Sequence, residues 1–100
     1  MQIKIEKEAI KALLHELEDV PFSMFSSAYE CYVSQELLKI FILKLMKRSM
    51  DMKPHIQMEL EPPTMRMLQY VLARITTEHP FHHFVISELL IKIDRQCHEL

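Results

Sequence analysis

The segment Leu37-Leu38-Lys39-Ile40-Phe41-Ile42-Leu43-Lys44-Leu45-Met46 is the densest apolar stretch of the chain. At about 100° per residue, its apolar side chains cover well over half of a helix, which is more than a surface helix needs. The segment therefore indicates either a helix surrounded by other helices or a helix with a second apolar face for a partner. Because Lys39 and Lys44 interrupt it and a bilayer span takes about 20 apolar residues, it predicts no membrane helix.

The composition favours helices over strands. The chain has 100 residues, of which 49% are hydrophobic and none is glycine. Tight β-hairpins and phosphate-binding loops depend on a residue that adopts positive φ easily, and glycine is the usual choice. Its absence argues against a hairpin-rich β fold and against a glycine-rich nucleotide site. Since the length is that of one domain, we expect residues 1–100 to form a single, mainly helical domain.

Hydrophobic periodicity and the prolines divide the chain into four helices. Pro21, Pro54 and Pro80 interrupt the helical pattern, because proline lacks a backbone N–H and disfavours helical geometry in the residue before it. Ser27 and Glu30 have the spacing of a capping box, which starts a helix, and Ser23 is a competing cap. The expected architecture is a four-helix bundle-like domain with one long central helix. The predicted helices run from Glu6 to about Asp19, from about Ser27 to about Met50, from Thr64 to Thr76 and from Phe81 to His98.

Two short segments have the alternating pattern of half-buried strands. In residues 2–5 and 56–60, the apolar side chains fall on every second position. A lone two-stranded ribbon is marginally stable in water and depends on packing against another element. We therefore predict that the two segments pair into a short ribbon lying on the helices. The alternative for residues 2–5 is the frayed start of the first helix.

Charge and cysteine content indicate an intracellular protein. The formal net charge is −2, with 12 basic and 14 acidic residues spread along the chain, so no half of it predicts electrostatic binding to nucleic acid. Cys31 and Cys97 lack the spacing of a metal site, and residues 1–6 lack the apolar core of a signal peptide. These features predict reduced thiols, a cytoplasmic location and no cofactor.

Apolar residues that the predicted core does not need mark candidate partner-binding sites. Phe84 and Ile91 form a second apolar line on the far side of the last helix, away from its main stripe. Tyr29 and Tyr32, together with Phe22 and Phe25, begin the long helix with an aromatic line, which either packs on the first helix or recognises a partner. From Phe84, Ile91, Tyr29 and Tyr32 we expect a non-enzymatic interaction or regulatory protein that self-associates as a homodimer.

Three histidines define an alternative function as a metal-binding protein. His79 and His83 lie one helical turn apart with His82 between them, and this spacing lets two imidazoles reach one metal ion. Against this, a helix N-terminus repels cations, and Glu78 is the one adjacent acid. The metal site is therefore an alternative to the expected function and not its basis.

A basic cluster defines a second alternative, a nucleic-acid-binding regulator. Lys44, Lys47 and Arg48 lie toward the end of the long helix, where positive charge complements the helix dipole. Contact with phosphates is the other interpretation of this cluster. Catalysis finds no support, because neither the cysteines nor the serines have an activating neighbour in the sequence, and we expect no enzyme.

Overall fold

The computed structural model describes residues 2–18, 20 and 27–98. Within these residues the chain forms one compact domain with four helices and a two-stranded antiparallel sheet, which confirms the predicted fold class. Its principal extents are 39, 31 and 24 Å. The elements are, in chain order, β1 (Gln2–Glu6), α1 (Lys7–Glu18), α2 (Ala28–Arg48), β2 (His55–Glu59), α3 (Pro62–Arg74) and α4 (Pro80–His98).

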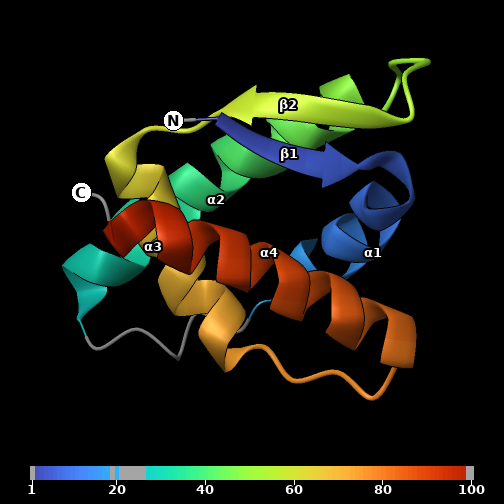
Figure 1. The fold of residues 1–100 in the computed structure, drawn as a ribbon. Helices are drawn as coiled ribbons and strands as arrows, with labels where there is room; N and C mark the ends of the chain where they lie inside the picture. The colour runs from blue at the N-terminus through green and yellow to red at the C-terminus, as the bar shows by residue number, and fades with distance from the viewer. Residues whose placement is uncertain (1, 19, 21–26, 99–100) are drawn as a thin grey trace.

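The predicted ribbon forms, and it covers one side of the helices (Figure 1). β1 and β2 run antiparallel, with Ile3 opposite Met58 and Ile5 opposite Ile56. These four side chains are buried, whereas the β1 and β2 residues between them are exposed, as the alternation predicts. The Nζ of Lys92 in α4 donates a hydrogen bond of 3.0 Å to a β1 carbonyl. Packing on the helices thus supplies the stability that two strands alone lack.

α1 follows β1 without a connecting loop. The N–H of Lys7 donates a hydrogen bond of 3.0 Å to the carbonyl of Pro54, which directly precedes β2, so the first turn of the helix is tied to the sheet. The helix then buries Ile10, Leu13 and Leu17 at a spacing of three and four residues. Its last residue is Glu18, and the predicted end near Asp19 lies outside the described residues.

α2 begins directly after Ser27, one of the two predicted caps; the competing cap, Ser23, lies outside the described residues. The backbone of Ser27 is extended, and its Oγ accepts a hydrogen bond of 3.1 Å from the N–H of Glu30. This bond satisfies one of the N–H groups that have no partner within the first turn of a helix. The helix ends at Arg48, two residues before the predicted Met50.

α2 is the longest of these helices, and it buries one stripe only. Leu38, Phe41 and Leu45 lie in the core, each with at most 2% of its surface exposed. Ile40 and Leu43 on the other side of the helix are 49% and 64% exposed. α1 and α3 pack against α2 from the core side, so its far side faces solvent. Of the two interpretations of the apolar segment, the structure supports a helix with a second apolar face.

α3 and α4 complete the core. α3 starts at Pro62, two residues earlier than predicted, because prolines fit the first turn, where the backbone N–H groups have no partner within the helix. It ends at Arg74, since Ile75 already has extended backbone angles, φ −73° and ψ 132°. α4 starts at Pro80. Its buried residues are Val85, Ile86, Leu89, Ile93 and Cys97.

The packing of the helices separates two exposed faces. α1 and α3 each pack against α4 as well as α2, which places α2 and α4 on opposite sides of the bundle. In Figure 1, α4 lies in front and α2 behind. Among the helices of the described residues, none is both long and apolar enough to cross a bilayer.

Candidate functional site

A long apolar face of α2 is turned away from the core. We define the outer face of α2 by seven residues: Tyr29, Tyr32, Glu36, Lys39, Ile40, Leu43 and Met46. Its five aromatic and apolar side chains are 47% to 78% exposed. Tyr29 and Tyr32, two of the predicted partner-binding residues, form one end of this face and are mostly exposed, so they do not take the core-packing role considered for them. Phe22 and Phe25 of the predicted aromatic line lie outside the described residues. Exposed apolar residues gathered on one face of this length are typical of interaction surfaces.

A charged pair interrupts the outer face of α2 near its middle. The Nζ of Lys39 lies 3.7 Å from the Oε1 of Glu36, one turn away on the same helix. Their side chains are 70% and 50% exposed. Such a solvated pair contributes at most about 1 kcal/mol to the folded chain. The pair places one negative and one positive charge within an otherwise apolar surface.

The other two predicted partner-binding residues lie on α4. Phe84 and Ile91 are 62% and 59% exposed, so both point away from the core as predicted. Glu88 and Lys92 lie along the same stretch of the helix and form an ion pair of 3.6 Å. Because α2 and α4 are on opposite sides of the bundle, the four predicted residues belong to two surfaces and not to one.

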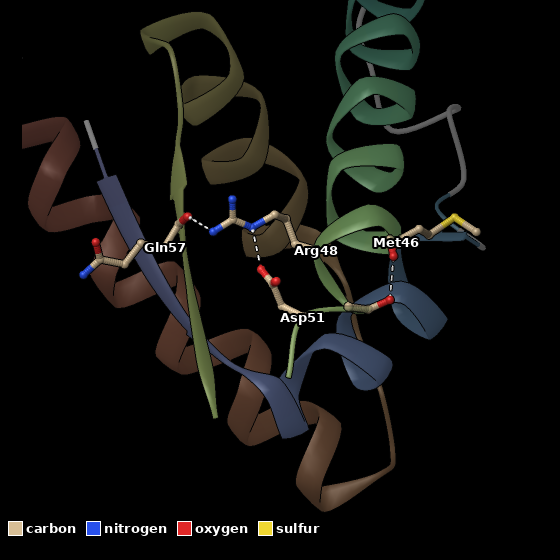
Figure 2. A network of polar contacts seen from close by, with 5 residues as sticks. Met46, Arg48, Asp51 and Gln57 are labelled. Carbon is tan, nitrogen blue, oxygen red and sulfur yellow. Dashed lines mark hydrogen bonds and ion pairs between the residues drawn. The ribbon is translucent and has the colours of Figure 1, made fainter. Parts of the chain in front are cut away.

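The basic residues at the end of α2 are partly used by the fold. Figure 2 shows Arg48 between the end of α2 and β2, where its Nη2 donates a hydrogen bond of 3.0 Å to the carbonyl of Gln57. Its Nε lies 3.5 Å from a carboxylate oxygen of Asp51. Lys44 and Lys47 line a shallow hollow beside β2 that also contains the acidic Glu59. Arg48 therefore ties the α2–β2 connection to the sheet, and the carboxylate in the hollow disfavours a bound phosphate.

Two histidines and a glutamate join α1 to α4. The Nδ1 of His82 lies 2.8 Å from the Oε1 of Glu16, and these side chains are only 17% and 14% exposed. The ring of His15 meets the ring of His82 edge-on, with 5.3 Å between the centroids. One ligand atom from each of the three side chains lies within 4.8 Å of the other two. This set of three residues is named the α1–α4 cluster.

The α1–α4 cluster differs from the histidine set predicted from the sequence. Of His79, His82 and His83, only His82 belongs to it. The ring of His79 stacks on that of His82 at 4.1 Å, and His83 is exposed. His15 and Glu16 were not identified because their partner lies 66 residues further along the chain. The sequence shows only that His15 and Glu16 lie on the polar side of the first predicted helix.

The surroundings of Glu16 favour its ionised form. Burial raises the pKa of Glu16, but hydrogen bonds from His82 and Thr77 and the electrostatic attraction of His82 and His15 lower it by more, so its pKa lies below the ordinary value. The hydroxyl of Thr77 also accepts a hydrogen bond of 3.2 Å from the N–H of His79. The connection between α3 and α4 is thereby held against the carboxylate on α1.

Comparison of the chain with protein-family models, with curated proteins and with solved structures finds no match. Function is therefore inferred from the chemistry of the exposed faces and of the α1–α4 cluster alone. The exposed faces offer apolar and charged side chains to another macromolecule. The α1–α4 cluster offers nitrogen and oxygen ligands to a small cation.

Proposed function

We propose that this protein is a small, non-enzymatic interaction protein that acts as a homodimer, with the two copies meeting through the outer face of α2. The order of side chains along the outer face supports the proposal. Apolar residues lie at both ends and Glu36 and Lys39 lie at the centre, so an antiparallel second copy presents a complementary side chain at each position. We place the dimer in the cytoplasm, where Cys31 and Cys97, both free thiols in the structure, stay reduced.

The residues of the outer face have the spacing of a helix-pairing seam. Positions 29, 32, 36, 39, 43 and 46 follow one another in alternating steps of three and four residues. This is the spacing of the a and d positions in a coiled-coil heptad, which keep one seam facing the partner helix. Leu38, Phe41 and Leu45 lie on the opposite side, so α2 can pack on its own core and on a second helix at the same time.

Antiparallel pairing brings the apolar positions of two such seams together. We set the two-fold axis between residues 37 and 38. Tyr32 then faces Leu43 of the second copy, and Tyr29 faces Met46 of the second copy. In an antiparallel coiled coil, each a position meets a d position of the other helix, and these contacts follow that rule. Every aromatic side chain of the seam thus meets an aliphatic one.

The charges select this antiparallel arrangement. About the same axis, Glu36 faces Lys39 of the second copy, so two symmetric ion pairs flank the centre of the interface. A parallel pair in register would instead bring Glu36 against Glu36 and Lys39 against Lys39. Like charges at facing positions of paired helices are unfavourable and act against the wrong orientation. The single charged pair therefore specifies the direction and register of the dimer.

The size of the face predicts a reversible dimer. The exposed fractions of its five apolar side chains correspond to about 600 Å² per copy, somewhat less than the roughly 800 Å² per partner of a standard interface. Charged pairs add direction more than affinity, because their loss of hydration offsets much of their attraction. We expect a dissociation constant in the micromolar range, which is about −8 kcal/mol at 1 μM.

The exposed face of α4 supports self-association less well. Phe84 and Ile91 lie two turns apart, and Glu88 lies between them and forms an ion pair with Lys92, the residue after Ile91. With Phe81, which is 42% exposed one turn before Phe84, α4 offers three exposed apolar side chains against the five of the outer face of α2, and Glu88 interrupts them. Phe84 nevertheless provides a matched control, because it is as exposed as Leu43, 62% against 64%.

Light scattering across a range of protein concentrations tests the proposal. The wild-type mass should rise from 12.0 kDa toward twice this value as concentration increases. Leu43→Glu should remain at 12.0 kDa, whereas Phe84→Glu should dimerise like the wild type; circular dichroism should show equal helix content in all three. A wild-type protein that stays monomeric at every concentration refutes self-association. Dimerisation lost in Phe84→Glu and kept in Leu43→Glu would place the interface on α4 and refute the role of α2.

A further inference from the structure

We propose that the α1–α4 cluster is a binding site for a zinc-like divalent cation, with His15, Glu16 and His82 as its protein ligands. Two imidazoles and one carboxylate are a ligand set that zinc accepts, and three protein ligands leave a fourth position for water or an added ligand. The site lies between α1 and α4, away from the outer face of α2. It is therefore independent of the proposed dimer.

The spacing of the three ligand atoms suits one small ion. Ligands about 2.1 Å from a tetrahedral zinc ion lie about 3.4 Å from one another. In the structure one ligand atom of each residue lies within 4.8 Å of the other two, and His82 Nδ1 and Glu16 Oε1 are 2.8 Å apart. Small side-chain rotations open the short distance and close the longer ones. The cation would take the place of the proton shared by these two atoms.

The third side chain distinguishes this cluster from an ordinary ion pair. The contact of His82 with Glu16 is complete with two members and by itself explains how α4 is joined to α1. His15 is exposed, yet its ring lies against that of His82 and its ligand atom lies within reach of both others. Consecutive residues of a helix point about 100° apart, so His15 and Glu16 can bind one ion only if it lies between them. His82 lies in that direction.

Neighbouring residues hold the ligands in place. Metal ligands in proteins are usually oriented by a second layer of hydrogen bonds and packing. Here a hydrogen bond from Thr77 reaches Glu16, and the ring of His79 stacks on His82. His82 is the third residue of α4, where the helix dipole disfavours a cation, and the carboxylate of Glu16 at this helix end offsets that effect.

Titration of zinc into the metal-free protein tests the site. Calorimetry measures the binding, and thermal unfolding measures the gain in stability. The wild type should bind one zinc ion per chain, and its midpoint of unfolding should rise by about 10 °C when free zinc exceeds the dissociation constant about 100-fold. His15→Ala is the decisive variant, because it removes an exposed side chain that the His82–Glu16 contact does not need. It should unfold like the wild type without zinc and bind zinc at least tenfold more weakly. Glu16→Gln should show the same loss.

His83→Ala is the matched control, since His83 is a neighbouring, exposed histidine outside the cluster. It should bind zinc like the wild type. The monomeric Leu43→Glu protein should also keep its zinc affinity, so failure of one proposal can be distinguished from failure of the other. The site is refuted if the wild type shows no saturable zinc binding, if His15→Ala binds as tightly as the wild type, or if His83→Ala abolishes binding.

Discussion

Reversing either charge at the centre of the outer face of α2 should weaken the homodimer, and two variants with complementary reversals should pair with each other in preference to themselves. In the proposed register, Glu36→Lys places a lysine opposite Lys39 of the second copy, and Lys39→Glu places a glutamate opposite Glu36 of the second copy. Each variant alone therefore repels itself. When the two variants are mixed, both facing positions carry opposite charges, and the heterodimer should form.

The size of this effect follows from the exposure and the symmetry of the pair. Glu36 and Lys39 are half exposed or more, so each contact in the dimer is worth about 0.5 kcal/mol and its reversal costs about 1 kcal/mol. Since the two-fold axis duplicates the contact, each variant should lose about 2 kcal/mol, or about 30-fold in Kd. The contact within one helix, 3.7 Å long, is also lost, at a cost of only a few tenths of a kcal/mol.

Sedimentation velocity of each variant, of the equimolar mixture and of the Glu36→Lys, Lys39→Glu double variant measures these constants. The mixture should regain wild-type affinity, and the double variant should form a homodimer again because both facing pairs are restored in reverse. The reasoning is refuted if the single variants dimerise as tightly as the wild type. It is equally refuted if the mixture associates no better than its components.

Other predictions concern the folded chain itself. Ser27→Ala should lower the free energy of unfolding by about 1 kcal/mol in urea titration, because the N–H of Glu30 loses its acceptor; an unchanged midpoint would show that this cap is not needed. Phe41→Ala should cost about 3 to 5 kcal/mol, whereas Ile40→Ala in dilute protein should cost less than about 1 kcal/mol, and equal losses would contradict the assigned orientation of α2. Folding lowers the pKa of Glu16. In metal-free buffer the wild type should therefore have a higher free energy of unfolding than Glu16→Gln above about pH 5, and this difference should shrink as the pH falls and Glu16 is protonated. A difference that grows on acidification would contradict the lowered pKa.

Local sequence patterns predict the elements of this fold well. Alternating apolar residues identify both strands, and the Ser27–Glu30 spacing identifies the start of α2. The orientation of α2 was open because residues 37–46 are apolar on both sides, and periodicity cannot distinguish the side that meets α1 and α3 from the side that meets solvent. The packing of α1 and α3 against one side of α2 leaves its other apolar side exposed to solvent.

The α1–α4 cluster shows the limit of local reasoning. The sequence directs attention to His79, His82 and His83 because they are close along the chain. The structure keeps His82 and supplies its neighbours from α1, 66 residues earlier. Which polar residues of one helix meet those of another depends on how both helices turn their apolar stripes to the core, and a single sequence does not specify that rotation.

A nuclear Overhauser contact between the Tyr32 ring and the Leu43 methyl groups of different copies tests the dimer most directly. Within one chain these residues are 11 positions apart on the same helix, about 16 Å along its axis, which is too far for such a contact. In a mixture of isotope-labelled and unlabelled protein, the antiparallel dimer predicts an intermolecular signal between them. A dimer that instead shows contacts of Phe84 or Ile91 across copies, without the signal between Tyr32 and Leu43, would contradict the proposed interface.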